Sequence, residues 1–181
     1  LREALTELPA SETARRIKGM GALARAQLYA GAVKEAKAIA LDAVALARDL
    51  GDPAVTARAL SILIEFPEEP EDSLALVAAG EEMALMAARA GDRELEGQAR
   101  FHCATHILEL GRMEQCAQAM QELRRVNRDI GQSVFFLYEI GLRATLAMLR
   151  GDLAQAEALI LEGLRLRTPG TMYSLDPLSV L

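Results

Sequence analysis

Apolar positions along the chain follow the 3.6-residue period of amphipathic helices. The stretch from Ala32 to Pro53 shows this clearly, because its apolar side chains fall on one face and Gly31 and Gly51-Asp52-Pro53 bound it. The preceding stretch, about residues 11–30, has the same pattern on a face made by Ile17, Met20, Leu23, Ala24 and Leu28. Two consecutive helices joined by a glycine turn predict a helical hairpin.

The glycine turns recur in register. Gly51-Asp52 returns as Gly91-Asp92 and Gly131-Gln132, at 40-residue steps, and Gly31 returns as Gly111 and Gly151. A fixed period of this size is typical of helical repeat arrays, in which each unit packs only on its neighbours. The predicted fold is therefore all-α: a right-handed α-solenoid of about four hairpins with a 40-residue period.

The period divides residues 1–181, predicted to be a single solenoid fragment, into repeats. Residues 1–10 are expected to end a preceding repeat, and 168–181 to start the next one or form a tail. Both ends therefore look like cuts through a longer array. The repeats between them are 11–50, 51–90, 91–130 and 131–167.

Helix ends are predicted from capping residues. Ser11, Asp72 and Asp152 are expected to cap the helices that follow them, and Asp52 to cap a helix with Pro53 at its first position. The second repeat departs from the others, because its first helix, about residues 53–66, ends at Pro67-Glu-Glu-Pro70 where they have a glycine turn.

Small residues form two rows beside the turn glycine. Seven positions before it stand Ala24, Ala104 and Ala144, and five positions after it stand Ala36, Cys116 and Ala156. Short side chains let helices approach closely, so these rows are predicted to be buried contacts. The pattern resembles the tetratricopeptide (TPR) repeat, except in repeat two, which has Ile64 and Leu76 there. It also differs in its longer period and in lacking the large aromatics of the first helix.

Residue chemistry gives little indication of an enzyme. His102 and His106 share one helix face, with Glu109 a turn further on, so a metal site is a less favoured alternative. The sequence HCATH lacks the glutamate of the zinc-protease motif HExxH, since Cys103 stands there. Glu65, Glu109 and Glu139 are expected to be solvated, and Cys103 and Cys116 to be buried, reduced thiols. No catalytic residue, metal or cofactor is assigned.

Charge and hydropathy limit the partners. The net charge of −6 has no basic stripe, which disfavours contact with nucleic acid. No apolar run approaches the roughly 20 residues of a membrane span. A cytoplasmic binding module is the resulting expectation.

The long repeat with its ALARDLGDP junction resembles the arrays of large ATP-dependent LuxR-type (MalT-like) bacterial transcriptional regulators, and those of multidomain cyclases. This resemblance implies a non-catalytic sensor or assembly segment of a larger signalling protein, whose other domains could carry an ATPase or cyclase. The alternative is a structural or oligomerisation spacer, motivated by apolar ends such as Leu1, Leu5 and Leu178.

The TPR resemblance also implies a binding groove on the first helices, which would take a protein, a peptide or a small effector. The residues assigned to this concave face are Arg25, Tyr29, Arg58, Glu65, Gln98, Phe101, His102, Thr105, Glu109, Tyr138 and Thr145. The same transfer also places Lys18, Gly21, Leu28, Ser61 and Gly141 there. For Phe101 and Tyr138, packing between neighbouring hairpins is an equal alternative.

Overall fold

The computed structural model describes residues 2–9, 11–66, 73–130 and 134–166, and all regular elements in these ranges are helices. They are α1 (Arg2–Glu7), α2 (Thr13–Tyr29), α3 (Val33–Leu50), α4 (Pro53–Leu63), α5 (Ser73–Ala90), α6 (Arg93–Glu109), α7 (Met113–Ile130), α8 (Val134–Leu149) and α9 (Leu153–Leu166). No described helix is long and apolar enough to cross a membrane.

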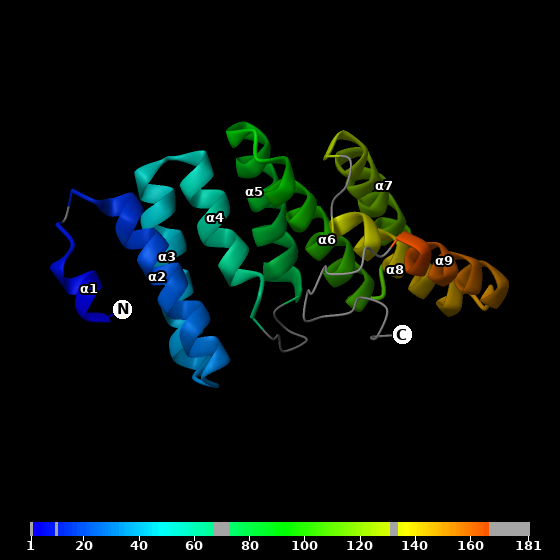
Figure 1. Cartoon of the computed structure of the whole chain (residues 1–181), viewed down its shortest axis with the longest axis horizontal. Helices are drawn as coiled ribbons and strands as arrows, with labels where there is room; N and C mark the ends of the chain where they lie inside the picture. Colours follow the sequence, from blue (N-terminus) through cyan, green and yellow to red (C-terminus); the bar gives the residue numbers. More distant parts are fainter. Residues whose placement is uncertain (1, 10, 67–72, 131–133, 167–181) are drawn as a thin grey trace.

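Helices α2 to α9 pair as four consecutive hairpins, α2–α3, α4–α5, α6–α7 and α8–α9. Figure 1 shows the pairs following one another along the long axis of the molecule, from the blue α2–α3 hairpin to the orange α9. Each described pair also packs on the next one. The all-α, solenoid-like fold is therefore the one that the periodicity predicts.

Turn glycines and aspartates set the ends of these helices. Gly31, Gly51, Gly91, Gly111 and Gly151 all have positive φ, between 70° and 82°, which side chains disfavour. The Asp52 carboxylate accepts hydrogen bonds from the Ala54 and Val55 amides, Asp92 accepts one from Leu95, and Asp152 accepts one from Gln155. The predicted caps at Asp52 and Asp152 are thus confirmed.

Two local predictions are wrong. Helix α2 begins at Thr13 with Glu12 at the capping position, and no side chain caps it, so Ser11 is not its N-cap. Helix α4 ends at Leu63 rather than near residue 66, and a turn follows in which Phe66 donates its amide to the Leu63 carbonyl. Residues 67–72, 131–133 and 167–181 lie outside the described ranges, and with them the predictions for Asp72, Gly131 and the tail.

The small-residue rows are buried as predicted. Ala24, Ala104, Ala144, Ala36 and Cys116 are fully buried, and Ala156 is nearly so. In the second repeat the larger Ile64 and Leu76 fill the same places and are also buried. The Cys116 thiol donates to the Ala104 carbonyl, so the two rows meet within the third hairpin.

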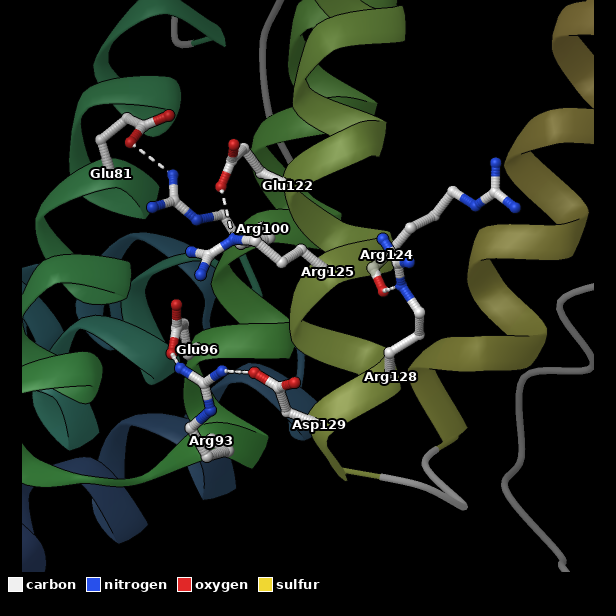
Figure 2. A network of polar contacts seen from close by, with 9 residues as sticks. All are labelled: Glu81, Arg93, Glu96, Arg100, Glu122, Arg124, Arg125, Arg128 and Asp129. Carbon is white, nitrogen blue, oxygen red and sulfur yellow. Dashed lines mark hydrogen bonds and ion pairs between the residues drawn. The ribbon is translucent and has the colours of Figure 1, made fainter.

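Ion pairs reinforce the contacts between α5, α6 and α7 (Figure 2). Arg100 on α6 bonds Glu81 on α5 at 2.9 Å. Arg93 bonds both the buried Glu96 on its own helix and Asp129 on α7. Charge thus joins the two helices of the third hairpin to each other and links this hairpin to α5.

Candidate functional site

The predicted groove residues belong to the first helices of the hairpins, or directly follow them. Helices α2, α4, α6 and α8 pack in sequence, each against the next, so their side chains can form one continuous surface. We call the side chains assigned to it above, from Arg25 to Thr145, the first-helix face.

Two ion pairs cross this face. The Arg25 guanidinium donates two hydrogen bonds to the Glu65 carboxylate, at 2.9 and 2.7 Å, and so links α2 to the turn after α4. This bonding raises the pKa of Arg25. Arg58 on α4 reaches Asp92, the cap of α6, at 3.2 Å. Both pairs connect neighbouring hairpins while leaving part of each side chain accessible.

Phe101 and Tyr138 stack on each other. Their ring centroids are 4.9 Å apart, with an angle of 25° between planes, so they join α6 to α8. The ring of His102 meets Phe101 edge-on at 5.5 Å. The predicted alternative, packing between neighbouring hairpins, is therefore what these two aromatics do. Both remain half-buried and keep some surface exposed.

Other predicted residues are less well placed to contact a partner. The Thr105 and Thr145 hydroxyls donate to carbonyls one turn earlier, and Gln98 is half-buried. Gly21, Ser61 and Gly141 are buried, contrary to their assignment to the groove surface. A Cβ on Gly21 would lie 2.2 Å from Ile62 Cδ1, so this position serves close helix packing. Tyr29, at 82% exposure, is the most accessible aromatic of the set.

The histidine pair does not gather a metal-binding set. The ring centroids of His102 and His106 are 6.0 Å apart, and His106 Nδ1 is 2.9 Å from Glu109 Oε2. Across the described ranges, no three or more His, Cys, Asp or Glu side chains are grouped to hold an ion. Burial, with the nearby charge of His106, lowers the pKa of His102 to about 4. His102 is therefore neutral at pH 7.

A second polar cluster lies between α7 and α8, and the sequence reasoning missed it. Glu139 is only 2% exposed, contrary to the expectation that it is solvated. One of its carboxylate oxygens lies 3.0 Å from Arg124 Nε and 3.8 Å from Arg143, and the other accepts a hydrogen bond from Asn127 at 3.4 Å. We call these four residues the α7–α8 joint. Burial raises the pKa of Glu139, while Asn127 and the two arginines oppose the shift.

A signal for this joint is present in the repeat register. Forty residues earlier, the equivalent positions are all buried and carry small or apolar side chains. Arg124 corresponds to Ala84 of the preceding repeat, Asn127 to Ala87, Glu139 to Ala99, and Arg143 to Cys103. An apolar seam between consecutive hairpins has thus become polar at one joint, which alignment of the repeats against one another could have revealed.

The same register explains how closely the helices approach. A Cβ on Gly80 of α5 would lie 2.5 Å from Cys103 Sγ and 3.6 Å from the Ala99 carbonyl oxygen of α6. Forty residues on, Met120 replaces Gly80 and Arg143 replaces Cys103. The larger side chains keep α7 and α8 apart, and these helices accordingly share fewer close backbone approaches than α5 and α6.

An open pocket of about 250 Å³ occupies the resulting space. Helices α7, α8 and α9 all contribute to it. Its lining consists of Ala117, Met120, Gln121, Arg124, Arg143, Leu146, Arg150, Gln155 and Leu159.

The raised pKa of Glu139 leads to a prediction for its neutral isostere. Its folded surroundings disfavour the charged carboxylate, so the Glu139→Gln variant should lose little stability at pH 7. The arginines left behind remain solvated, because the Arg124 and Arg143 side chains are 54% and 32% exposed. We expect the free energy of unfolding in urea to stay within about 0.5 kcal/mol of wild type, or to rise.

The pH dependence has a definite sign. A carboxyl group whose pKa is raised by folding contributes most stability below its unfolded pKa, and loses that contribution as pH rises through the folded value. The advantage of Glu139→Gln over wild type should therefore grow as pH rises. A loss above about 2 kcal/mol at pH 7 would mean that the bonds from Arg124 and Asn127 outweigh the burial of the charge.

Comparison with known proteins supports the fold and goes no further. No protein-family model and no curated protein matches the sequence. Among solved structures, 18 chains match. One is the crystal structure of BtubC (BKLC) from P. vanneervenii, with a TM-score of 0.77 and 17% sequence identity over 98% of this chain and 74% of that one. At this identity the similarity shows a shared helical fold.

Proposed function

We propose that this chain is a non-catalytic binding module whose first-helix face holds a peptide segment of a partner protein, or a small effector. The observation that carries the proposal is the line of partly exposed groups across successive first helices. The Phe101–Tyr138 stack supplies an aromatic anchor, and the Arg25–Glu65 and Arg58–Asp92 pairs supply charges of both signs. Aromatic and arginine side chains contribute strongly to protein interfaces.

Titration behaviour supports a non-catalytic role. Burial raises the pKa of Cys103 to about 12 and also raises the pKa of Cys116, so both thiols stay protonated and poorly nucleophilic at pH 7. His102 is held neutral and half-buried beside Phe101, away from any paired nucleophile among the described residues. These groups suit a packed scaffold better than a reaction centre.

The wider context of the proposal comes from the resemblance of the repeats. We place the module in a larger cytoplasmic bacterial protein of the transcriptional-regulator or signalling type, as its sensor or assembly segment. In this proposal the array itself contacts neither DNA nor membrane. The net charge of −6, without a basic stripe, supports the first point, because binding along a nucleic-acid backbone needs an extended basic surface.

Selection from a phage library of random short peptides tests the proposed surface. We expect peptides that bind the purified chain, and we expect Arg58→Glu to weaken their binding about ten-fold or more, because charge reversal removes a contact and adds repulsion. The matched control is Arg48→Glu. Arg48 also pairs with an acid 34 residues further on, Glu82, but this pair joins the second helices, with Arg48 on α3 and Glu82 on α5.

Circular dichroism should show unchanged helix content in both variants. Equal loss of binding in the two variants would place the peptide site elsewhere. Failure to select any peptide, together with a molar mass that rises with concentration in light scattering, would favour the structural alternative. That alternative is motivated by apolar residues near the two ends of the sequence, and leucines exposed along α9, among them Leu153, Leu161 and Leu164, also support it.

A further inference from the structure

The pocket at the α7–α8 joint concentrates positive charge in an acidic chain. Three arginines line it, Arg124 from α7, Arg143 from α8 and Arg150 from the turn directly after α8, and no carboxylate does. The chain as a whole has a net charge of −6. Gln121 and Gln155 add neutral hydrogen-bonding groups, and Met120, Leu146 and Leu159 form apolar parts of the wall.

Internal pairing leaves part of this charge uncompensated. Arg124 and Arg143 share the single buried carboxylate of Glu139. The Arg150 guanidinium has no hydrogen-bonding or ion-pair partner within the described parts of the chain. Glu162 on α9 is near enough to raise the pKa of Glu139, but it is exposed and does not line the pocket.

The side chains that hold the arginines also make the site specific to this joint. Glu139 is fixed by burial and by Asn127, and it orients Arg124 and Arg143 toward one region between α7 and α8. Figure 2 shows the Arg124 side chain leaving α7 on the side away from α6, whereas the neighbouring Arg125 extends toward α6. At the preceding joint, Ala84 and Cys103 occupy the places of Arg124 and Arg143 and are buried.

We propose that this pocket binds a small organic anion with two negative charges, a phosphate monoester or a dicarboxylate. Guanidinium groups bind both anions through paired, charge-assisted hydrogen bonds. A volume of about 250 Å³ suits a molecule of a few carbon atoms, whose skeleton would contact Met120, Leu146 and Leu159. Such a ligand bridges the third and fourth hairpins. This site is separate from the first-helix face, so either proposal can fail alone.

Isothermal titration calorimetry of the intact chain at low ionic strength tests the site. The probes are glycerol 3-phosphate and succinate, with acetate and glycerol as singly charged and neutral comparators. We expect saturable binding of one dianion, and the two probes distinguish a phosphate from a dicarboxylate. Arg150→Gln and Arg143→Gln should each weaken that binding about ten-fold or more, because each removes charged hydrogen bonds to the ligand.

The matched control is Arg125→Gln. It removes the same charge from α7, at an exposed residue that pairs with Glu122 and does not line the pocket. The affinity of this variant should stay within about two-fold of wild type, since the Arg125 side chain extends toward α6 (Figure 2) and makes no contact with the pocket. Absence of binding by both dianions up to about 10 mM would overturn the proposal, as would equal effects of Arg125→Gln and Arg150→Gln. Arg150→Gln removes no hydrogen bond or ion pair within the described residues, so misfolding should not obscure the result.

Discussion

Replacing Gly80 by leucine should lower the free energy of unfolding by about 2 kcal/mol or more. Overpacking destabilises the folded chain, and it outweighs the gain in helix propensity that replacing a glycine brings. Replacing a glycine inside a helix normally raises stability by about 1 kcal/mol, because the unfolded chain then has less conformational freedom to lose on folding. Here, however, a Cβ would already lie 2.5 Å from Cys103 Sγ and 3.6 Å from the Ala99 carbonyl oxygen of α6, which leaves no room for the further carbons of leucine. The backbone of α6 cannot change rotamer to make room as a side chain can, so a leucine at this position would force α5 and α6 apart. Urea denaturation followed by circular dichroism measures the change.

Two further variants separate overpacking from other causes. Ala78→Leu adds the same side chain at an exposed position on the same helix and should leave stability within about 0.5 kcal/mol of wild type. Gly80→Ala should be destabilising alone but neutral or stabilising in a Cys103→Ala background, where the contacted sulfur is absent. A neutral result for Gly80→Leu would mean that the contact between α5 and α6 has room for a larger side chain.

Wild-type protein should lose about 3 kcal/mol of stability through His102 when the pH is lowered from 7 to 4. The unfolded histidine has a pKa near 6.5, whereas burial and the charge of His106 lower the folded value to about 4. Between these values only the unfolded chain takes up the proton, so this contribution is present above pH 6.5 and lost as pH falls to about 4. Each unit of pKa difference corresponds to about 1.4 kcal/mol.

The His102→Gln variant isolates this effect from the titration of the carboxylates. We expect its unfolding free energy to fall by about 3 kcal/mol less than that of wild type over the same pH range. Gln98→Asn, one turn earlier on α6, changes no titrating group and should keep the wild-type pH dependence. Identical pH profiles for His102→Gln and wild type would show that the imidazole is hydrated in the folded chain.

Much of the fold could be predicted because its determinants are local and repeated. Gly51, where the first hairpin joins the second, adopts positive φ, and the carboxylate of the next residue, Asp52, caps the helix that begins there. Burial of Ala24 and Ala36 follows from fixed distances to the turn glycine. The end of α4 was misplaced because two prolines indicate where a helix must stop, not where it already has.

The candidate site was harder to predict, because its chemistry depends on contacts between repeats. Arg25 is recognisable as a polar residue on the first helix, but its bond to Glu65 joins residues 40 positions apart. Nothing in its own sequence neighbourhood distinguishes Glu139 from a surface glutamate. Only comparison with the equivalent position one repeat earlier, the buried Ala99, indicates that it is buried. Helical periodicity specifies which side of a helix a residue faces, and it does not specify whether the next hairpin covers that side.

The polar α7–α8 joint also affects how the chain unfolds. In a linear array, cooperativity is transmitted only through the contacts between adjacent units. Apolar residues from α2 to α6 form one continuous cluster, whereas the apolar contacts across the α7–α8 joint belong to a smaller one, made by Ala104, Cys116, Met120, Leu142 and Leu146. The coupling between the third and fourth hairpins thus combines this smaller cluster with the ionic contacts of the joint, and salt weakens the ionic part. Gly80 and His102 both lie before that joint, in the part of the chain that would stay packed if the fourth hairpin unfolded first.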